Sequence, residues 1–219
     1  MPDASLTTFP AVVLAAGRSQ RMGRPKCALP AGGPHTFASR LAATLHTSGL
    51  SPIVFVTSRD GRGELDQSLG DWRAHVVTIE NPHPERGQLS TLHCGLEHIG
   101  VESPAVLITL VDVPFTTSRS IAALIDAWRE HQAPVVRPSR GDRHGHPIVV
   151  GSPAIRALAA ADPGEETMRE VLAKFASGRL DVTVDEEWRL ADIDTPEEYE
   201  AALRQLTIRE RTSDGPGEA

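Results

Sequence analysis

Basic side chains and small residues gather directly after the first apolar run of the sequence. The small residues follow Leu14 in the run Leu14–Gly17, and four cations come within nine positions after it: Arg18, Arg21, Arg24 and Lys26. Small residues let backbone N–H groups approach phosphate oxygens, and the cations neutralise phosphate charge. The spacing fits neither a Walker A loop nor a G-x-G-x-x-G dinucleotide turn. The stretch indicates a triphosphate site, with a solvated basic loop as the alternative.

Aspartates stand at two places where a strand would bring them to the same edge of a sheet. Asp112 follows the apolar run Ala105–Val111, and Asp192 and Asp194 point to one side if their segment is extended. Mg²⁺ takes one or two protein carboxylates and fills its octahedron with phosphate oxygens and water. The alternatives are a turn residue at Asp112 and, at Asp194, a carboxylate that complements a helix N-terminus.

Short apolar runs and helical patterns alternate along the chain, which predicts an α/β fold with a mainly parallel sheet. The helical patterns are Phe37 to Leu45 and Ile121 to Trp128, each with apolar residues on one face. The predicted strands are Ala11–Leu14, Ile53–Val56, Val76–Ile79, Ala105–Val111 and Pro134–Val136. In such a sheet the ligand lies at the carboxyl ends of the strands, where the basic loop and Asp112 are expected.

The C-terminal part of the sequence combines a helix start signal with a polar end. Thr195, Pro196 and Glu198 fit a capping box, and the apolar face that follows predicts a helix to about Leu206. We expect one domain over residues 1–210, because no linker is found. The residues 211–219 are polar, charged or Gly/Pro and predict a disordered tail.

Composition excludes several classes of protein. A formal net charge of -7 and a pI near 5.7 argue against a nucleic-acid or anionic-membrane partner. Two cysteines are too few for a disulfide framework, and the sequence has neither a signal peptide pattern nor a run of about 18 apolar residues. We expect a cytoplasmic protein.

The stretch L-A-A-G-x-S-x-R-M-G-x-P-K resembles the signature of the MobA-like nucleotidyltransferases. The resemblance implies a Rossmann-like three-layer α/β/α domain of the nucleotide-diphospho-sugar-transferase type. It implies that Lys26 and Arg21 act on the triphosphate together with Asp112. The nucleotide-binding residues that it implies in this loop are Leu14, Ala15, Ala16, Gly17, Arg18, Ser19 and Lys26.

Three later segments resemble the family in the same order along the chain. D-V-P at Asp112 and D-I-D-T-P-E-E at Asp192 imply a Mg²⁺ site formed by Asp112 and Asp194, with Asp192 as the second choice. The segment from Asn81 to Leu96 implies base contacts by Gln88 and Ser90. The acceptor residues implied, in some cases despite departures from the family pattern, are His146, His93 and Arg169. For His93 an exposed structural position is the alternative.

The resemblance implies transfer of a nucleoside monophosphate to a small phosphorylated acceptor, with release of pyrophosphate. Ala16 favours CTP, since guanylyltransferases tend to read L-A-G-G, and molybdopterin is the expected acceptor, with an apo-molybdoenzyme as a possible recipient of the product. The alternatives are GTP or another NTP with a different small phosphorylated acceptor, a non-catalytic pterin cofactor carrier, and an oxidoreductase recruited from this fold. The carrier is disfavoured by intact Lys26, Asp112 and Asp194.

Overall fold

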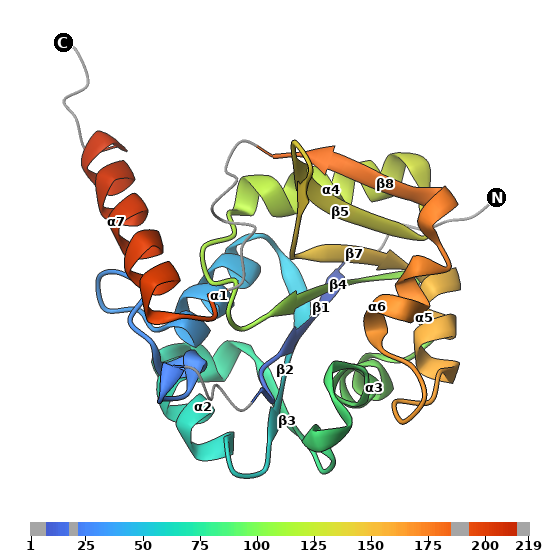
Figure 1. The fold of residues 1–219 in the computed structure, drawn as a ribbon, viewed down its shortest axis with the longest axis horizontal. Coiled ribbons are helices and arrows are strands. Elements are labelled where there is room, and N and C mark those ends of the chain that lie inside the picture. Colours follow the sequence, from blue (N-terminus) through green and yellow to red (C-terminus); the bar gives the residue numbers. More distant parts are fainter. Residues whose placement is uncertain (1–7, 18–21, 185–192, 214–219) are drawn as a thin grey trace.

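A single mixed sheet organises the part of the chain that the structure describes. The computed structural model describes residues 8–17, 22–184 and 193–213, with side chains to Thr207. These residues form eight strands in the order β3-β2-β1-β4-β7-β5-β6, with β8 beside β5 (Figure 1). The strands are β1 (Phe9–Leu14), β2 (Leu50–Ser58), β3 (Val77–Asn81), β4 (Ala105–Leu110), β5 (Val135–Arg140), β6 (Arg143–His144), β7 (Ile148–Gly151) and β8 (Arg179–Thr183).

The strands next to the predicted loop are parallel, as the sequence pattern indicated. β1 pairs in parallel with β2 and β4, and β2 pairs in parallel with β3. β7 interrupts this order, because it runs antiparallel to both β4 and β5. The carboxyl ends of β1, β2 and β4 therefore open onto the same edge of the sheet, where α/β proteins bind ligands.

Helices cover both faces of the sheet, which gives the three layers of the predicted α/β fold (Figure 1). α1, α2 and α4 contribute to one apolar cluster, and α3, α5 and α6 contribute to the other. The helices are α1 (Phe37–Thr47), α2 (Arg62–Leu69), α3 (Gln88–Ile99), α4 (Ser118–His131), α5 (Ser152–Ala160), α6 (Met168–Ala173) and α7 (Pro196–Ser213). None of the helices within these ranges is long and apolar enough to cross a bilayer.

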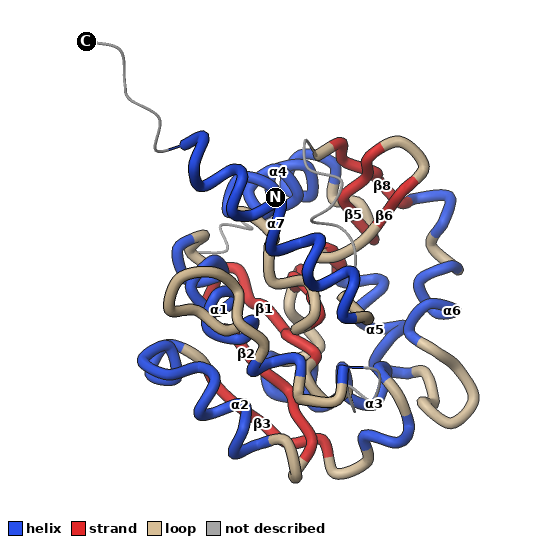
Figure 2. The backbone as a smooth tube through the Cα atoms, turned by 60° about the vertical axis from the view of Figure 1, so that its left-hand side comes forward, coloured by secondary structure: helices blue, strands red, loops and turns tan. Residues whose placement is uncertain are grey.

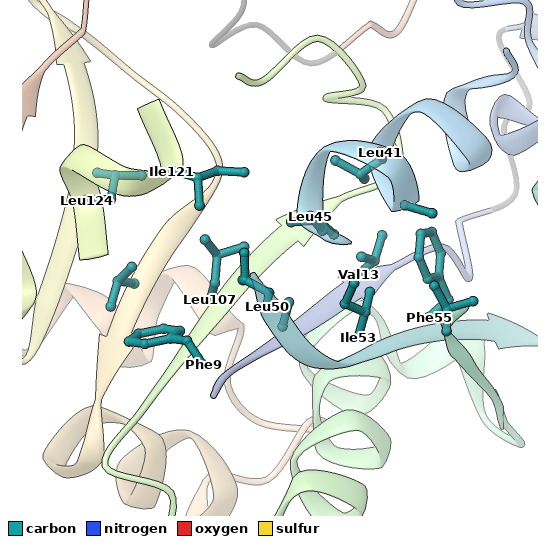
Figure 3. Packing of buried hydrophobic residues seen from close by; sticks show 14 of the residues in the cluster. Phe9, Val13, Leu41, Leu45, Leu50, Ile53, Phe55, Leu107, Ile121 and Leu124 are labelled. Atoms are coloured by element: carbon teal, nitrogen blue, oxygen red, sulfur yellow. The ribbon is translucent and has the colours of Figure 1, made fainter. Parts of the chain in front are cut away.

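Packing follows the alternation of side chains along the central strands. Val13 and Leu107 point to the face covered by α1 and α4, where they meet Leu41, Leu45 and Ile121 (Figure 3). Residues one position away on these strands point to the α3 and α5 face. Both faces of β1 and β4 are buried, which explains why these strands read as continuous apolar runs.

The last helix is longer than the sequence pattern predicted. α7 runs from Pro196 to Ser213, whereas its apolar face ends at Leu206. No glycine or proline occurs between Pro196 and Gly215, and Glu and Arg are good helix formers. The helix therefore continues beyond its apolar face. It includes residues 211–213 of the segment for which the sequence predicts a disordered tail, and 214–219 lie outside the described residues. Ala202 and Leu206 of α7 pack in one apolar cluster with Phe37 of α1 and with Phe115, and the C-terminal end of the helix extends away from the sheet (Figure 2).

Candidate active site

A cleft of about 890 Å³ opens at the carboxyl ends of β1, β2 and β4. It contains eight of the twelve predicted site residues that the structure describes, although they come from distant parts of the chain. The predicted residues that line it are Leu14, Ala15, Ala16, Gly17, Lys26, Gln88, Asp112 and Asp194. The parallel arrangement of the three strands brings these segments to one place.

Lys26 links the two predicted metal ligands. Its Nζ donates a hydrogen bond to Asp112 Oδ2 at 2.7 Å and another to Asp194 Oδ1 at 2.5 Å. The three side chains are largely shielded from solvent, with exposed fractions of 11% for Lys26, 17% for Asp112 and 33% for Asp194. Asp112 and Asp194 therefore converge on one ammonium group, although they lie 86 and 168 positions from Lys26 in the sequence.

Asp194 is held in place by backbone contacts on both sides. The Ile193 N–H donates to the Asp112 carbonyl oxygen at 3.1 Å, which ties the segment before α7 to the end of β4. Glu198 Oε2 accepts hydrogen bonds from the Asp194 and Thr195 N–H groups, at 2.8 and 2.9 Å. The Glu198 N–H donates in turn to Thr195 Oγ1 at 3.2 Å, so the predicted capping box is present. The capping box therefore fixes the start of α7 and the backbone of Asp194 together.

The electrostatics of the cleft favour a divalent cation. Burial alone would lower the pKa of Lys26, but the hydrogen bonds and charges of Asp112 and Asp194 outweigh it and raise the pKa. Lys26 is therefore protonated throughout the physiological range. Among the described residues that line the cleft, three carboxylates, including Asp60, stand against this one ammonium. A polyanionic triphosphate fits there only when further positive charge accompanies it.

The two aspartates fit a Mg²⁺ ion. Asp112 Oδ1 is buried and has no hydrogen-bond partner within the described part of the chain, although buried polar atoms are normally satisfied. Asp194 accepts a hydrogen bond from the same Lys26 ammonium as Asp112 does. No third His, Cys, Asp or Glu of the described residues joins them, and Mg²⁺ usually keeps several positions for phosphate oxygens and water. The prediction for Asp192 falls outside the described residues.

The predicted phosphate loop enters the cleft directly after β1. The Ala15 N–H donates to the Val56 carbonyl oxygen at 2.8 Å, so this amide serves the sheet and phosphate contacts fall to the residues after it. Ala16 is buried against the cleft wall, and Gly17 is exposed. The predicted residues Arg18, Ser19 and Arg21 lie outside the described residues.

The start of α3 contributes one of its two predicted residues to the cleft, together with one that was not predicted. Gln88 lines the cleft, but Ser90 does not. The Ser90 hydroxyl accepts from Asn81 Nδ2 at 2.9 Å and lies within hydrogen-bond distance of the His83 and Gly87 carbonyl oxygens. Ser90 therefore holds the loop between β3 and α3, and the next residue, Thr91, lines the cleft.

His146 lies beside β4 and close to the aspartate pair, but it is not among the residues that line the cleft. Its Nδ1 is 3.4 Å from the Ile108 carbonyl oxygen. Burial lowers the pKa of His146 more than the Ile108 hydrogen bond and the Asp112 charge raise it, so the imidazole is neutral at pH 7. The acceptor role of His146 stays a prediction.

The other two predicted acceptor residues lie away from the cleft. His93 Nε2 is 2.7 Å from the Leu158 carbonyl oxygen. Because a carbonyl only accepts, Nε2 carries the hydrogen, and His93 joins α3 to α5. Arg169 is exposed near the start of α6. Neither residue is among those that line the cleft, and their acceptor roles stay predictions.

Sequence analysis missed the end of β2 and the turn that follows it. Thr57, Ser58, Asp60 and Gly61 line the cleft beside the predicted residues. The signal was available in the topology, because β2 is the parallel neighbour of β1 and its carboxyl end must open onto the same edge. Polar residues in this turn are placed to contact a ligand that extends along the sheet edge.

The fold and this cleft define a nucleotide-binding transferase of the α/β class, with a phosphate loop after the first strand and carboxylates for a cation at the neighbouring strand. Residues 11–181 match the MobA-like NTP transferase domain, so the chain belongs to that family and is a nucleotidyltransferase. Asp194 lies beyond the matched range, and its position is therefore an observation of the structure alone.

The chain resembles two curated relatives over nearly their whole length. It is 25% identical over 202 residues to the molybdenum cofactor cytidylyltransferase of Escherichia coli (strain K12), covering 92% of this chain and 99% of the relative. It is 28% identical over 212 residues to a probable molybdenum cofactor guanylyltransferase of Opitutus terrae, covering 93% and 98%.

A solved structure supports the fold assignment. The structure of Rv0371C in complex with manganese, from Mycobacterium tuberculosis H37Rv, superposes with a TM-score of 0.69 at 20% identity. The match covers 90% of this chain and 98% of that chain. The architecture is the nucleotide-diphospho-sugar-transferase fold predicted from the sequence.

Proposed function

We propose that this nucleotidyltransferase transfers CMP from CTP to the terminal phosphate of molybdopterin, with Mg²⁺ as its metal. The observation that carries the proposal is the convergence of Lys26, Asp112 and Asp194 in the cleft behind the loop Leu14–Gly17. Both curated relatives are named for nucleotidyl transfer to the molybdenum cofactor, and they differ in the base. Ala16 supports CTP, because the guanylyltransferases of the family tend to carry glycine there.

The reaction needs positioning and charge stabilisation rather than a covalent enzyme intermediate. An oxygen of the acceptor phosphate attacks the α-phosphorus of CTP, the bond from that phosphorus to the bridging oxygen breaks, and pyrophosphate leaves with the electron pair. Asp112 and Asp194 would hold Mg²⁺, which neutralises charge on the triphosphate when bound. Lys26 neutralises charge on the departing pyrophosphate. The enzyme's own contribution is the geometry of the cleft.

The segments around the cleft suggest how the two substrates are arranged. The triphosphate lies along Ala16 and Gly17, and the base extends toward Gln88, Thr91 and the turn after β2 that sequence analysis missed. The acceptor approaches from the side of His146, whose Nδ1 donates to the Ile108 carbonyl oxygen and whose Nε2 is left to accept a hydrogen bond.

The test is pyrophosphate release with molybdopterin, Mg²⁺ and each of CTP, GTP, ATP and UTP. We expect CTP to give the highest kcat/KM and Asp112→Asn to lower kcat by about 100-fold or more, since it removes charge where the metal binds. Asp126→Asn is the matched control, because Asp126 is exposed on α4 and pairs with Arg129. Ala16→Gly should shift the preference toward GTP.

Each outcome has a separate meaning. A preference for GTP in the native protein would refute the proposed base and leave the acceptor standing. No release with any nucleotide, together with tight binding of molybdopterin, would refute transfer and favour a cofactor carrier. Equal activity of Asp112→Asn and the native protein would refute the metal site.

A further inference from the structure

The Lys26 ammonium stands where the proposed metal must bind. It contacts an oxygen of each candidate ligand, Asp112 and Asp194, at 2.7 and 2.5 Å. To ligate a divalent cation, these carboxylates must either release the ammonium or hold two cations side by side. Like charges a few ångströms apart repel strongly where water is partly excluded, and all three side chains are largely shielded.

The same cleft offers Lys26 another anionic partner when a nucleotide enters. Lys26 and the phosphate loop at Ala16 and Gly17 line one continuous cleft. A lysine has a flexible four-carbon stem and three donors that can turn to a new acceptor. A triphosphate along the loop therefore draws Lys26 away from the aspartates and leaves both carboxylates to the metal.

We propose that Lys26 is an internal competitor of the metal, so that Mg²⁺ binds weakly to the free enzyme and enters with the nucleotide or after it. The inference rests on the proposed function, because it takes the two aspartates as the metal ligands. Linkage then requires that metal and nucleotide strengthen each other's binding by the same factor. The free enzyme keeps its carboxylates neutralised by Lys26, and the complete site forms only around the substrate.

The direct test is Mn²⁺ binding without nucleotide, measured by the electron paramagnetic resonance signal of the free ion. We expect Lys26→Gln to tighten Mn²⁺ binding by about tenfold, a usual size for coupling between two sites. Lys26→Arg keeps the charge and should bind Mn²⁺ as weakly as the native protein. Lys174→Gln is the matched control, because Lys174 is the only other lysine of the sequence and pairs with Glu166 on the surface.

The double variant Lys26→Gln, Asp112→Asn should lose the gain, which locates the ion at the aspartates. Equal or weaker Mn²⁺ binding by Lys26→Gln than by the native protein would overturn the proposal. So would the same gain in Lys174→Gln, which would point to net charge alone. The measurement needs no turnover, so its result is independent of whether the nucleotide and acceptor are assigned correctly.

A second measurement uses the native protein and does not depend on the folding of a variant. Trace acylation of amines, followed by mass spectrometry, compares Lys26 with Lys174 in rising Mg²⁺ concentration without nucleotide. Metal that displaces the ammonium should increase labelling of Lys26 several-fold and leave Lys174 unchanged. Unchanged labelling of Lys26 at a Mg²⁺ concentration that saturates the site would overturn the proposal.

Discussion

Gly95 is where α3 comes closest to the sheet, and an added methyl group there would test that contact. A Cβ at Gly95 would lie 2.5 Å from Val12 Cγ1 and 3.3 Å from Val56 Cγ2. Both valines are fully buried, so neither can move aside freely. Overpacking of this kind costs about 1–3 kcal/mol, and alanine in place of glycine in a helix returns about 1 kcal/mol. Because 2.5 Å is a severe overlap, we expect Gly95→Ala to lose about 1–2 kcal/mol of unfolding free energy.

The assay is urea unfolding, followed by circular dichroism, in two backgrounds. Val12→Ala removes the methyl groups that a Cβ at Gly95 would strike, so Gly95→Ala should stabilise the Val12→Ala protein. The control is Gly63→Ala in α2, where a Cβ meets no atom within 4 Å and stability should rise by up to about 1 kcal/mol. An equal cost of Gly95→Ala in both backgrounds, or no cost in the native one, would refute the reasoning.

Two further predictions concern charged side chains outside that contact. Burial alone would raise the pKa of Asp66, but the hydrogen bond from Arg62 and the charges of Arg62 and Arg73 outweigh it and lower the pKa. Asp66→Asn should therefore lower the unfolding free energy by about 1 kcal/mol at pH 7. The difference between variant and native protein should shrink as the pH falls below about 3.9, where the native carboxylate becomes protonated. A constant difference from pH 7 to 3 would contradict this prediction. Glu198→Ala should raise the Mn²⁺ concentration for half-maximal activity several-fold, because the backbone of Asp194 loses its acceptor. Glu198→Gln keeps the capping box and should behave like the native enzyme. Equal effects of Glu198→Ala and Glu198→Gln would mean that only the negative charge of Glu198 matters.

The sequence was most informative where one strand determines the position of a residue. Leu14–Gly17 and Asp112 each follow a buried strand, so the edge of the sheet fixes their place, and both lie in the cleft. Lys26 was assigned to the triphosphate, and the sequence contains no signal that it bridges two aspartates. That contact depends on the docking of Ile193 and Asp194 beside the end of β4, which no local pattern determines.

The predicted residues that the structure describes outside the cleft include two from α3, Ser90 and His93. Ser90 and Thr91 are neighbours near the start of α3, and the direction of each side chain depends on the loop that Asn81 holds. His93 is drawn to the Leu158 carbonyl oxygen by the packing of α5, a helix that the sequence pattern had not identified. Because a helix turns by about 100° per residue, neighbouring residues such as Ser90 and Thr91 point in different directions.

The backbone contact between Ile193 and Asp112 has a consequence for the way the enzyme is made. Within the described residues, the last strand of the sheet ends at Thr183, and the second carboxylate joins the cleft only when Ile193 pairs with Asp112 after β4. Because synthesis on the ribosome runs from the N-terminus and domains form as the chain emerges, the sheet and the phosphate loop can assemble before Asp194 has left the exit tunnel. The nascent chain would then hold a nucleotide cleft with one of its two carboxylates, and the pair would be completed only after Asp194 emerges.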